Sequence, residues 1–260
     1  MTAHAFGVDI GGSGVKGAPV DVSTGELVGE RVRIPTPQPA TPRAVAKVVG
    51  QIIEQVAERT GDDAIENLAE MPVGITVPAI VSHGVTRSAA NIDKKWIDAP
   101  AEEIFADVLG RPVTILNDAD AAGYAEVYYG AAQGESGLVI VTTLGTGIGS
   151  ALVYHGQLIP NIELGHLEID GFDAEKRAAA SVRTKEDLSW KAYTKRLQRF
   201  YSKVEFLFSP DLFVVGGGIS RHSDKFLPQL DLRARIVPAQ LFNQAGIVGA
   251  ARFAHDAPAG

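Results

Sequence analysis

The chain has 260 residues, 45% of them hydrophobic, a length that suits one large or two medium-sized domains with substantial cores. No run approaches the roughly 20 apolar residues of a membrane span, and the absence of cysteine excludes disulfides, thiol catalysis and cysteine-ligated zinc. The net charge of −7 argues against a general nucleic-acid binder. The first predicted strand starts within a few residues of Met1, which leaves no room for a signal peptide, so we expect a cytoplasmic protein.

The first half of the chain is expected to combine strands and helices. Short apolar runs between turn residues predict three strands, at 6–10, 15–22 and 26–34. A Pro-rich extended segment follows, and Thr41 and Pro42 are typical of the N-cap and first position of a helix, which Gly61 is expected to end. The remaining predicted elements are a strand at 73–77, a loop at 91–100, a helix at 101–109 and a strand at 112–116.

The second half is expected to begin with an alanine-rich helix that Asn117–Asp120 caps and that ends at about Gln133. Apolar residues at 193, 197, 200, 204 and 207 predict a long helix over 186–208. The remaining predicted elements are strands at 138–142, 148–154 and 212–215, a polar loop region at 155–173 and a terminal helix at 245–255.

Two glycine-dense turns, one in each half, each join a pair of predicted strands. The first lies within 7–17, where Ser13 and Lys16 add a hydroxyl and a cation to the backbone N–H groups, and the second lies within 142–151. Glycines let the main chain approach an anion closely. A plain tight turn is the alternative for either stretch alone, but the repetition predicts a duplicated fold that binds one phosphate donor. A third glycine turn, Gly216–Gly218, either contacts phosphate or only connects a strand to a helix.

Asn117, Asp118 and Asp120 lie where a predicted strand meets a helix N-terminus. One of them is expected to be the N-cap. Three polar residues exceed what a cap requires, so one carboxylate is left for chemistry. Asp118 could act there as the general base of a phosphoryl transfer, a reaction that depends mainly on positioning and charge neutralisation.

A second polar cluster is expected around Glu163 and His166, which a glycine separates, with Glu175 nearby. These side chains suit a ring of sugar hydroxyls. Two alternatives are a histidine that is only solvated or bonded to backbone, and a metal site that uses His166 and Glu168.

Positive charge is concentrated in one segment. Residues 176–203 hold nine basic and two acidic residues, a local charge of +7, so the rest of the chain carries −14. On the predicted helix, Asp187, Lys191, Lys195, Arg199 and Lys203 recur every four residues. Such a stripe is either a solvated helix face or the binding surface of a polyanion.

Taken in order, these motifs resemble those of the ROK family of sugar kinases, within the actin/hexokinase-like superfamily. The resemblance covers essentially the whole chain and rests on Asp9–Ser13, Asn117-Asp118, Leu144–Gly149, Glu163–His166 and Gly216–Gly218. It implies an α/β protein of actin/hexokinase-like (ribonuclease H-like) fold, with two domains and a cleft between them. We expect a small N-terminal domain over 1–118, with a C-terminal helix at about 245–260 packing back on it, and a larger domain over 119–244.

The resemblance also implies phosphorylation of a hexose hydroxyl with Mg²⁺. Asp118 matches the family's catalytic base. The implied sugar contacts are Asn91, Asn117, Asp118, Glu163 and His166. The implied phosphate-binding residues are Asp9, Gly11, Gly12, Ser13, Lys16, Thr143, Gly145, Thr146, Gly147, Gly216, Gly217 and Gly218. No metal ligand on the protein is expected, because Mg²⁺ would accompany the donor phosphates.

One departure from the family matters. Most members carry a cysteine-rich zinc loop after the Glu-x-Gly-His motif, and this chain has no cysteine. If that loop is simply deleted, the family's further sugar-binding glutamate falls nearest Glu175, with Glu168 as the other candidate. The zinc-less form is similar to actinobacterial members that phosphorylate glucose, and in some cases mannose, with inorganic polyphosphate and ATP. The basic segment then becomes a polyphosphate groove formed by Arg183, Lys185, Lys191, Lys195 and Arg199.

We therefore expect a monomeric or homodimeric kinase that phosphorylates the 6-hydroxyl of glucose, and also mannose, with polyphosphate, ATP or both, and that has no nucleic-acid or membrane partner. An ATP-only glucokinase or N-acetylhexosamine kinase is the alternative within the same class. A non-catalytic sugar sensor is the alternative of another class. The sensors of this family carry an N-terminal helix-turn-helix, and the intact Asp118 and both phosphate turns favour an enzyme.

Overall fold

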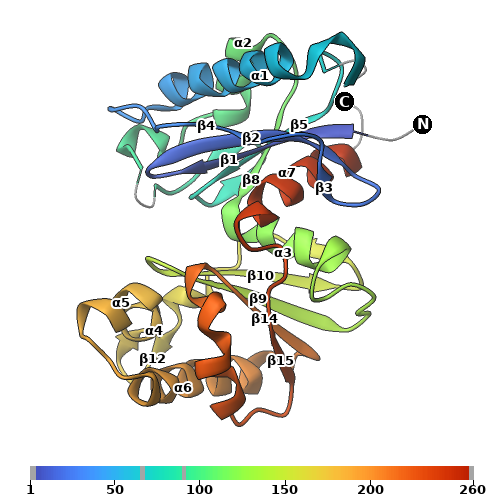
Figure 1. The fold of residues 1–260 in the computed structure, drawn as a ribbon. Coiled ribbons are helices and arrows are strands. Elements are labelled where there is room, and N and C mark those ends of the chain that lie inside the picture. The colour runs from blue at the N-terminus through green and yellow to red at the C-terminus, as the bar shows by residue number, and fades with distance from the viewer. Residues whose placement is uncertain (1–3, 65–67, 90–91, 258–260) are drawn as a thin grey trace. The chain divides into compact units, whose positions relative to one another are not determined.

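The computed structural model describes residues 4–64, 68–89 and 92–257. The chain divides into two compact units, Met1–Ala121 with Gln244–Gly260, and Ala122–Asn243. Each unit contains one mixed β-sheet with helices packed against it (Figure 1). Among the described residues, no helix combines the length and the apolar character that crossing a membrane requires.

The first unit is built on a six-stranded sheet in the order β3-β2-β1-β5-β8, with β4 also paired to β2. β1 and β2 form an antiparallel hairpin, whereas β1, β5 and β8 run parallel. α1 and α2 cover one face and α7 lies on the other (Figure 1). The elements are β1 (His4–Gly11), β2 (Gly14–Asp21), β3 (Glu26–Leu27), β4 (Val32–Ile34), α1 (Pro42–Ala64), β5 (Val73–Val77), the small hairpin β6 (Val81–Ser82) and β7 (Val85–Thr86), η1 (Lys94–Trp96), α2 (Ala101–Leu109), β8 (Thr114–Asn117) and α7 (Ala245–Asp256).

α7 approaches the sheet so closely that its backbone touches the strands. A Cβ on Gly7 of β1 would meet the carbonyl oxygen of Ile247, and one on Gly74 of β5 would meet that of Ala250. Both contacts would fall well inside the 3.0 Å at which real Cβ atoms are essentially never found. These two glycines are therefore required by packing rather than by a turn.

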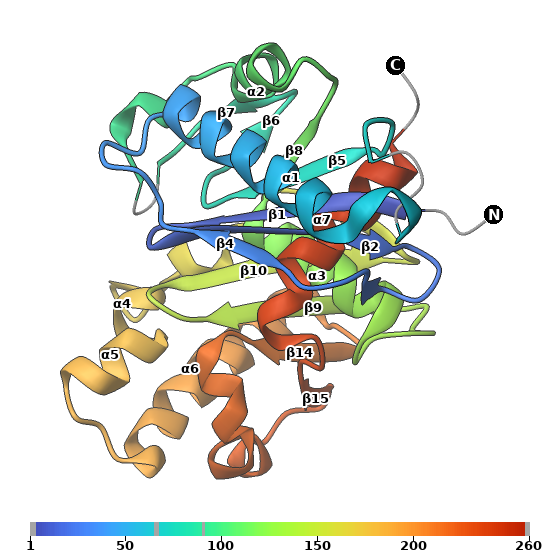
Figure 2. The same cartoon turned by 45° about the horizontal axis from the view of Figure 1, so that its top comes forward.

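The second unit has a five-stranded sheet in the order β11-β10-β9-β14-β15. Figure 2 labels four of these strands, β10, β9, β14 and β15. The sheet repeats the pattern of the first one, because β9 and β10 form an antiparallel hairpin and β14 runs parallel to β9. α6 buries Tyr193, Leu197, Phe200 and Val204 in the core of this unit. The elements are α3 (Asp118–Tyr129), which starts in the first unit, β9 (Leu138–Leu144), β10 (Ile148–Tyr154), β11 (Gln157–Ile159), η2 (Leu164–His166), β12 (Glu168–Ile169), β13 (Phe172–Asp173), α4 (Glu175–Ala178), α5 (Ala180–Lys185), α6 (Trp190–Phe208), β14 (Leu212–Gly216), η3 (Gly218–Lys225), η4 (Leu227–Gln229), β15 (Arg235–Pro238) and η5 (Phe242–Gln244).

Several predicted elements of the first half are confirmed and three are corrected. β5 and α2 have the predicted bounds, and the Ala44 N–H donates to Thr41 Oγ1 (3.3 Å) at the start of α1. The strand predicted at 26–34 is two strands, because Gly29 adopts a φ of 86° between them. α1 continues through Gly61 to Ala64, since a single glycine costs a helix only about 1 kcal/mol. The loop predicted at 91–100 contains η1, whose Trp96 is fully buried.

In the second half, β10 has the predicted bounds and two helix predictions are corrected. α3 ends at Tyr129, before Gln133. α6 begins at Trp190 instead of 186, because Ser189 accepts the Ala192 N–H as its N-cap, and Leu207 is 47% exposed instead of buried. The loop predicted at 155–173 contains β11 and the β12–β13 hairpin, and α4 and α5 were not predicted.

Candidate active site

The first glycine turn is the tip of the β1–β2 hairpin, with Gly12 and Ser13 exposed. Behind the tip, Asp9 and Lys16 are register partners, and Lys16 Nζ lies 3.0 Å from Asp9 Oδ2. The hydroxyl of Thr76 donates to the other carboxylate oxygen of Asp9 at 3.2 Å. The structure therefore places a half-buried cation and a fixed carboxylate beside exposed glycine backbone.

The structure separates the roles of the polar residues at the β8–α3 junction. Asn117 is buried, and its Oδ1 accepts the N–H groups of Ala119 (2.8 Å) and Asp120 (3.1 Å), so Asn117 is the N-cap. Its Nδ2 donates to the carbonyl oxygen of Ala79 (3.1 Å). Asp118 is exposed and accepts the Ala119 N–H at 2.8 Å. The first residue of α3 thus presents an exposed carboxylate at the N-terminus of the helix.

The second glycine turn joins β9 to β10. Gly145 and Thr146 are exposed, and the Gly145 N–H donates to the carbonyl of Gly147 (3.0 Å). Ser181 at the start of α5 bonds both exposed residues: its N–H donates to the Gly145 carbonyl (3.0 Å) and its hydroxyl to the Thr146 carbonyl (2.7 Å). The backbone carbonyls of Gly145 and Thr146 thus already accept hydrogen bonds from Ser181.

The third glycine turn lies beside the second. Gly216 at the end of β14 is the register partner of Thr143 in β9. Gly217 has a φ of 81°, and a Cβ there would collide with the backbone of Leu144. Gly217 and Gly218 are exposed. Thr143 and the turns at 145–147 and 216–218 are therefore brought together at the end of one sheet, as expected of residues that hold one anionic ligand.

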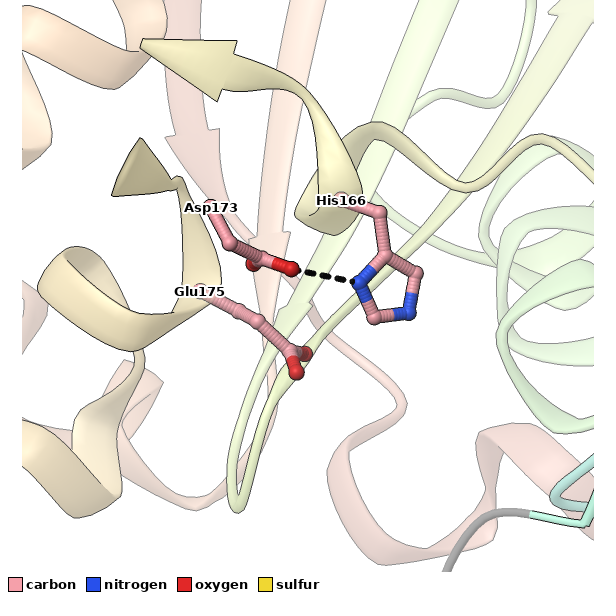
Figure 3. Close-up of side chains that lie close together, drawn as sticks. All are labelled: His166, Asp173 and Glu175. Atoms are coloured by element: carbon pink, nitrogen blue, oxygen red, sulfur yellow. Dashed lines mark hydrogen bonds and ion pairs between the residues drawn. The ribbon is translucent and has the colours of Figure 1, made fainter. Parts of the chain in front are cut away.

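Three of the predicted sugar-binding residues lie close to one another in the second unit. Glu163 is half-buried, and burial raises the pKa of its carboxyl; the nearby His166 opposes this shift and the nearby charge of Glu175 adds to it. Ligand atoms of His166, Asp173 and Glu175 all lie within 4.8 Å of one another (Figure 3). The Ile148 N–H, next to the second glycine turn, donates to Glu175 Oε2 at 3.2 Å.

Asp173 fixes the state of the His166 ring. Its Oδ2 lies 3.0 Å from His166 Nδ1 (Figure 3). An ionised carboxylate only accepts hydrogen bonds, so Nδ1 carries the proton and Nε2 is the acceptor of the neutral ring. The same hydrogen bond raises the pKa of His166 above its ordinary value. One ring nitrogen and two carboxylates at this spacing could also ligate a divalent cation.

Other predicted residues lie elsewhere. Glu168 is exposed in β12 and does not belong to the cluster of His166 and Glu175. Asn91 lies outside the described residues. Asp173 was not predicted as part of the site. A sequence signal for its position was present. Gly171 lies between the apolar residues Ile169 and Phe172, a pattern typical of a short hairpin, and the hairpin that forms there pairs Glu168 with Asp173.

The five residues of the predicted polyphosphate groove come from two helices. Arg183 and Lys185 belong to α5, and Arg183 packs over the Trp190 ring at 3.8 Å. Lys191, Lys195 and Arg199 are exposed on α6, and Arg199 forms two hydrogen bonds to the carboxylate of Asp170 (2.8 and 2.5 Å).

Comparison with known proteins gives a consistent result. The model of the ROK family matches residues 5–179. The polyphosphate glucokinase of Mycobacterium tuberculosis is 51% identical over 249 residues, which cover 95% of this chain and 90% of that protein. The crystal structure of the inorganic polyphosphate/ATP-glucomannokinase from Arthrobacter sp. strain KM is 54% identical, with a TM-score of 0.89 over 97% of this chain and 98% of that one. A ROK family glucokinase from Streptomyces griseus, solved with glucose and AMPPNP, has a TM-score of 0.80 at 24% identity and covers 98% of this chain and 100% of that one. These likenesses confirm the predicted α/β fold of the actin/hexokinase type.

Proposed function

The chain belongs to the ROK family, and we propose that it transfers a phosphoryl group from inorganic polyphosphate or ATP to the 6-hydroxyl of glucose or mannose. Relatives named polyphosphate glucokinase and polyphosphate/ATP-glucomannokinase, at 51% and 54% identity over almost the whole chain, support this substrate pair. The observation that carries the chemistry is the exposed Asp118 carboxylate beside a cap that Asn117 already provides.

In the proposed reaction Asp118 accepts the proton of the sugar hydroxyl. The hydroxyl oxygen forms a bond to the terminal phosphorus, and the bond from that phosphorus to the bridging oxygen breaks. The electron pair leaves on the shortened donor, which is ADP or a polyphosphate one unit shorter. A positioned general base contributes about 10²–10⁴-fold to such a step.

The sugar is held in this proposal by Glu163, His166 and Glu175, with Asn91 and Asn117 as further contacts. His166 presents Nε2 because Asp173 holds Nδ1. One N–H of the Asn117 amide is used by Ala79, so the other is the atom that can donate to a sugar oxygen. We assign the role of the further sugar-binding glutamate to Glu175 and not to Glu168, because Glu175 lies beside His166.

The donor phosphates are assigned to the glycine turns, to Ser13 and to Lys16. Mg²⁺, where bound, neutralises charge on the donor phosphates and orients them. Both oxygens of Asp9 already accept hydrogen bonds, from Lys16 and from Thr76. The residues present therefore suit a metal that is held mainly by phosphate oxygens and water. A monomeric or homodimeric assembly and a cytoplasmic location are also part of the proposal.

A donor-by-sugar activity matrix, with and without Mg²⁺, tests this function. We expect glucose 6-phosphate formation from polyphosphate in nucleotide-free buffer and also from ATP. Activity with ATP but not with polyphosphate would indicate an ATP-only kinase, either a glucokinase or an N-acetylhexosamine kinase according to the sugar that is phosphorylated. Sugar binding in calorimetry without any transfer would leave a sugar sensor.

Replacing Asp118 tests the proposed base. Asp118→Asn should retain glucose binding and lose about two or more orders of magnitude in kcat, because the proton has no acceptor. Glu103→Gln, an exposed change on α2, is the matched control and should keep both. Near-normal turnover of Asp118→Asn would remove Asp118 from this role.

A further inference from the structure

The second unit has a pocket that belongs to none of the glycine turns. It lies between the β12–β13 hairpin, α4 and α6, and has a volume of about 320 Å³. Its apolar lining comes from Ile169, Phe172, Ala174, Ala178 and Phe200. Its charged lining comes from Arg177, Lys195, Arg196, Arg199 and Asp170. A pocket of this size, with an apolar floor and a few convergent polar groups, is typical of a small-ligand site.

The pocket and the proposed sugar site use opposite sides of the same short segment. Phe172 lines the pocket and Asp173 belongs to the cluster around His166, because the two residues of β13 point to opposite faces of the strand. In the turn into α4 that follows, Ala174 lines the pocket and Glu175 belongs to the cluster. Arg177 follows Glu175 by two positions on α4, which turns it about 200° away around the helix axis. A ligand of the pocket is therefore distinct from a sugar bound at His166.

Two of the four cations in the pocket already have carboxylate partners. Arg199 bonds Asp170 through two nitrogens (2.8 and 2.5 Å), and Arg196 bonds Glu186 (2.6 Å). Arg196 also donates to the backbone carbonyl of Arg177 (3.2 Å), which ties α6 to α4.

The other two cations are Arg177 and Lys195. The guanidinium of Arg177 lies over the Phe172 ring at 3.7 Å, so its orientation is set by stacking. Within residues 4–64, 68–89 and 92–257, no carboxylate lies within 4.0 Å of the charged nitrogens of Arg177 or Lys195. Glu186, which is bonded to Arg196, interacts with Arg177 only at longer range. In the described part of the chain, Arg177 and Lys195 thus line a partly apolar pocket without an ion-pair partner within 4.0 Å, and a bound dianion would balance their charges.

We propose that this pocket binds a phosphate group. A phosphate dianion matches the charge of Arg177 and Lys195, and the planar guanidinium of arginine donates two parallel hydrogen bonds to phosphate oxygens. Such a ligand bridges α4 and α6. The phosphate group has two possible sources. One is a distal part of a polyphosphate chain, and this source rests on the proposed function. The other is a separate small phosphorylated compound, which is independent of the proposed function.

Calorimetric titration of the full chain with tripolyphosphate, after the donor site is saturated with a non-hydrolysable ATP analogue, tests the pocket. We expect one further site per chain, which Lys195→Gln and Arg177→Gln each weaken about tenfold, as expected for the loss of one charge-assisted hydrogen bond. Lys176→Gln is the control, because Lys176 is an exposed neighbour of Arg177 on α4 that does not line the pocket. No further site, or equal affinity in all four proteins, would overturn the proposal.

Lys195 is exposed, so Lys195→Gln keeps the test valid if Arg177→Gln fails to fold. Two further arms identify the source of the phosphate. The first arm measures the KM for long-chain polyphosphate, with tripolyphosphate as the short donor for comparison. If Lys195→Gln raises the KM for the long chain about tenfold, the pocket is assigned to the polymer. Binding of glycerol phosphate that the same variants weaken, with an unchanged KM for polyphosphate, assigns it to a small phosphorylated compound. If the wild-type chain transfers no phosphate to any sugar, the proposed function fails and the titration still decides the pocket.

Discussion

Gly147 couples the second glycine turn to the proposed sugar site, and Gly147→Ala should therefore impair glucose binding. A Cβ at this position would meet Glu175 Oε2 well inside the 3.0 Å limit of real Cβ contacts. The obstacle is the end of a flexible side chain, so we expect the carboxylate to move while the backbone stays. The displaced Glu175 loses its hydrogen bond from the Ile148 N–H, which is 3.2 Å long.

The size of the effect follows from the bonds that are lost. A hydrogen bond to a charged group is worth about 1.5–3 kcal/mol, so loss of a Glu175–sugar contact should raise KM for glucose roughly tenfold to 150-fold. Stability should change little. The lost Ile148 bond is partly exposed and is offset by the about 0.4–1 kcal/mol that alanine gains over glycine in the unfolded chain.

Steady-state kinetics with glucose and with each donor measure the change in KM, and thermal unfolding measures the change in stability. Gly145→Ala is the matched control, because a Cβ there meets nothing within 4 Å and should leave KM for glucose unchanged. Glu175→Gln should reproduce the defect of Gly147→Ala. A folded Gly147→Ala protein with the wild-type KM for glucose would refute the assignment of Glu175 to the sugar.

Three further predictions concern other parts of the chain. Asp173→Asn should destabilise the protein more at about pH 5.5 than at about pH 8.5 in thermal unfolding. The pairing raises the pKa of His166 in the folded protein. It therefore adds stability below the ordinary pKa of 6.5, and this stability is lost as the pH rises through the folded-state pKa. Equal losses at both pH values would contradict the pairing. Lys16→Gln should raise KM for both donors about tenfold and leave KM for glucose unchanged, which initial-rate kinetics can show; unaltered donor KM values would remove Lys16 from the donor site. Gly74→Ala should cost about 1–3 kcal/mol and lower Tm by about 2–12 °C, because its methyl group would collide with the backbone of α7. The control, Gly50→Ala on α1, meets only an ordinary 3.5 Å contact and should be neutral or stabilising, so a similar loss in both would contradict the packing argument.

The sequence was most informative where one local cause determines the structure. The predicted bounds of β5 and α2 agree with the structure, and both elements end beside a residue that stops them locally, Pro78 after β5 and Gly110 after α2. The glycine turns were predicted for the same reason. Leu207 follows the helical period of α6 but lies at its exposed end, a fact that depends on tertiary packing and not on spacing.

The site was predictable as a set of residue types and less so as a set of contacts. Asn117 and Asp118 were equally good caps from sequence, and only the hydrogen bonds assign the cap to Asn117. Asp173 escaped prediction because its role depends on a hairpin of two-residue strands, too short to give an apolar period. The helices α4 and α5 escaped prediction for the same reason, because they have only four and six residues and show no apolar period.

The glycine-mediated packing of α7 on β1 and β5 also has a consequence for synthesis. The ribosome completes Ala122–Asn243 before it reaches the helix that closes the first sheet. A nascent chain therefore holds its opening strands with one sheet face bare while the middle of the polypeptide has all the segments it needs to fold. The face of β1 and β5 that α7 covers in the folded protein therefore stays exposed until α7 has been synthesised.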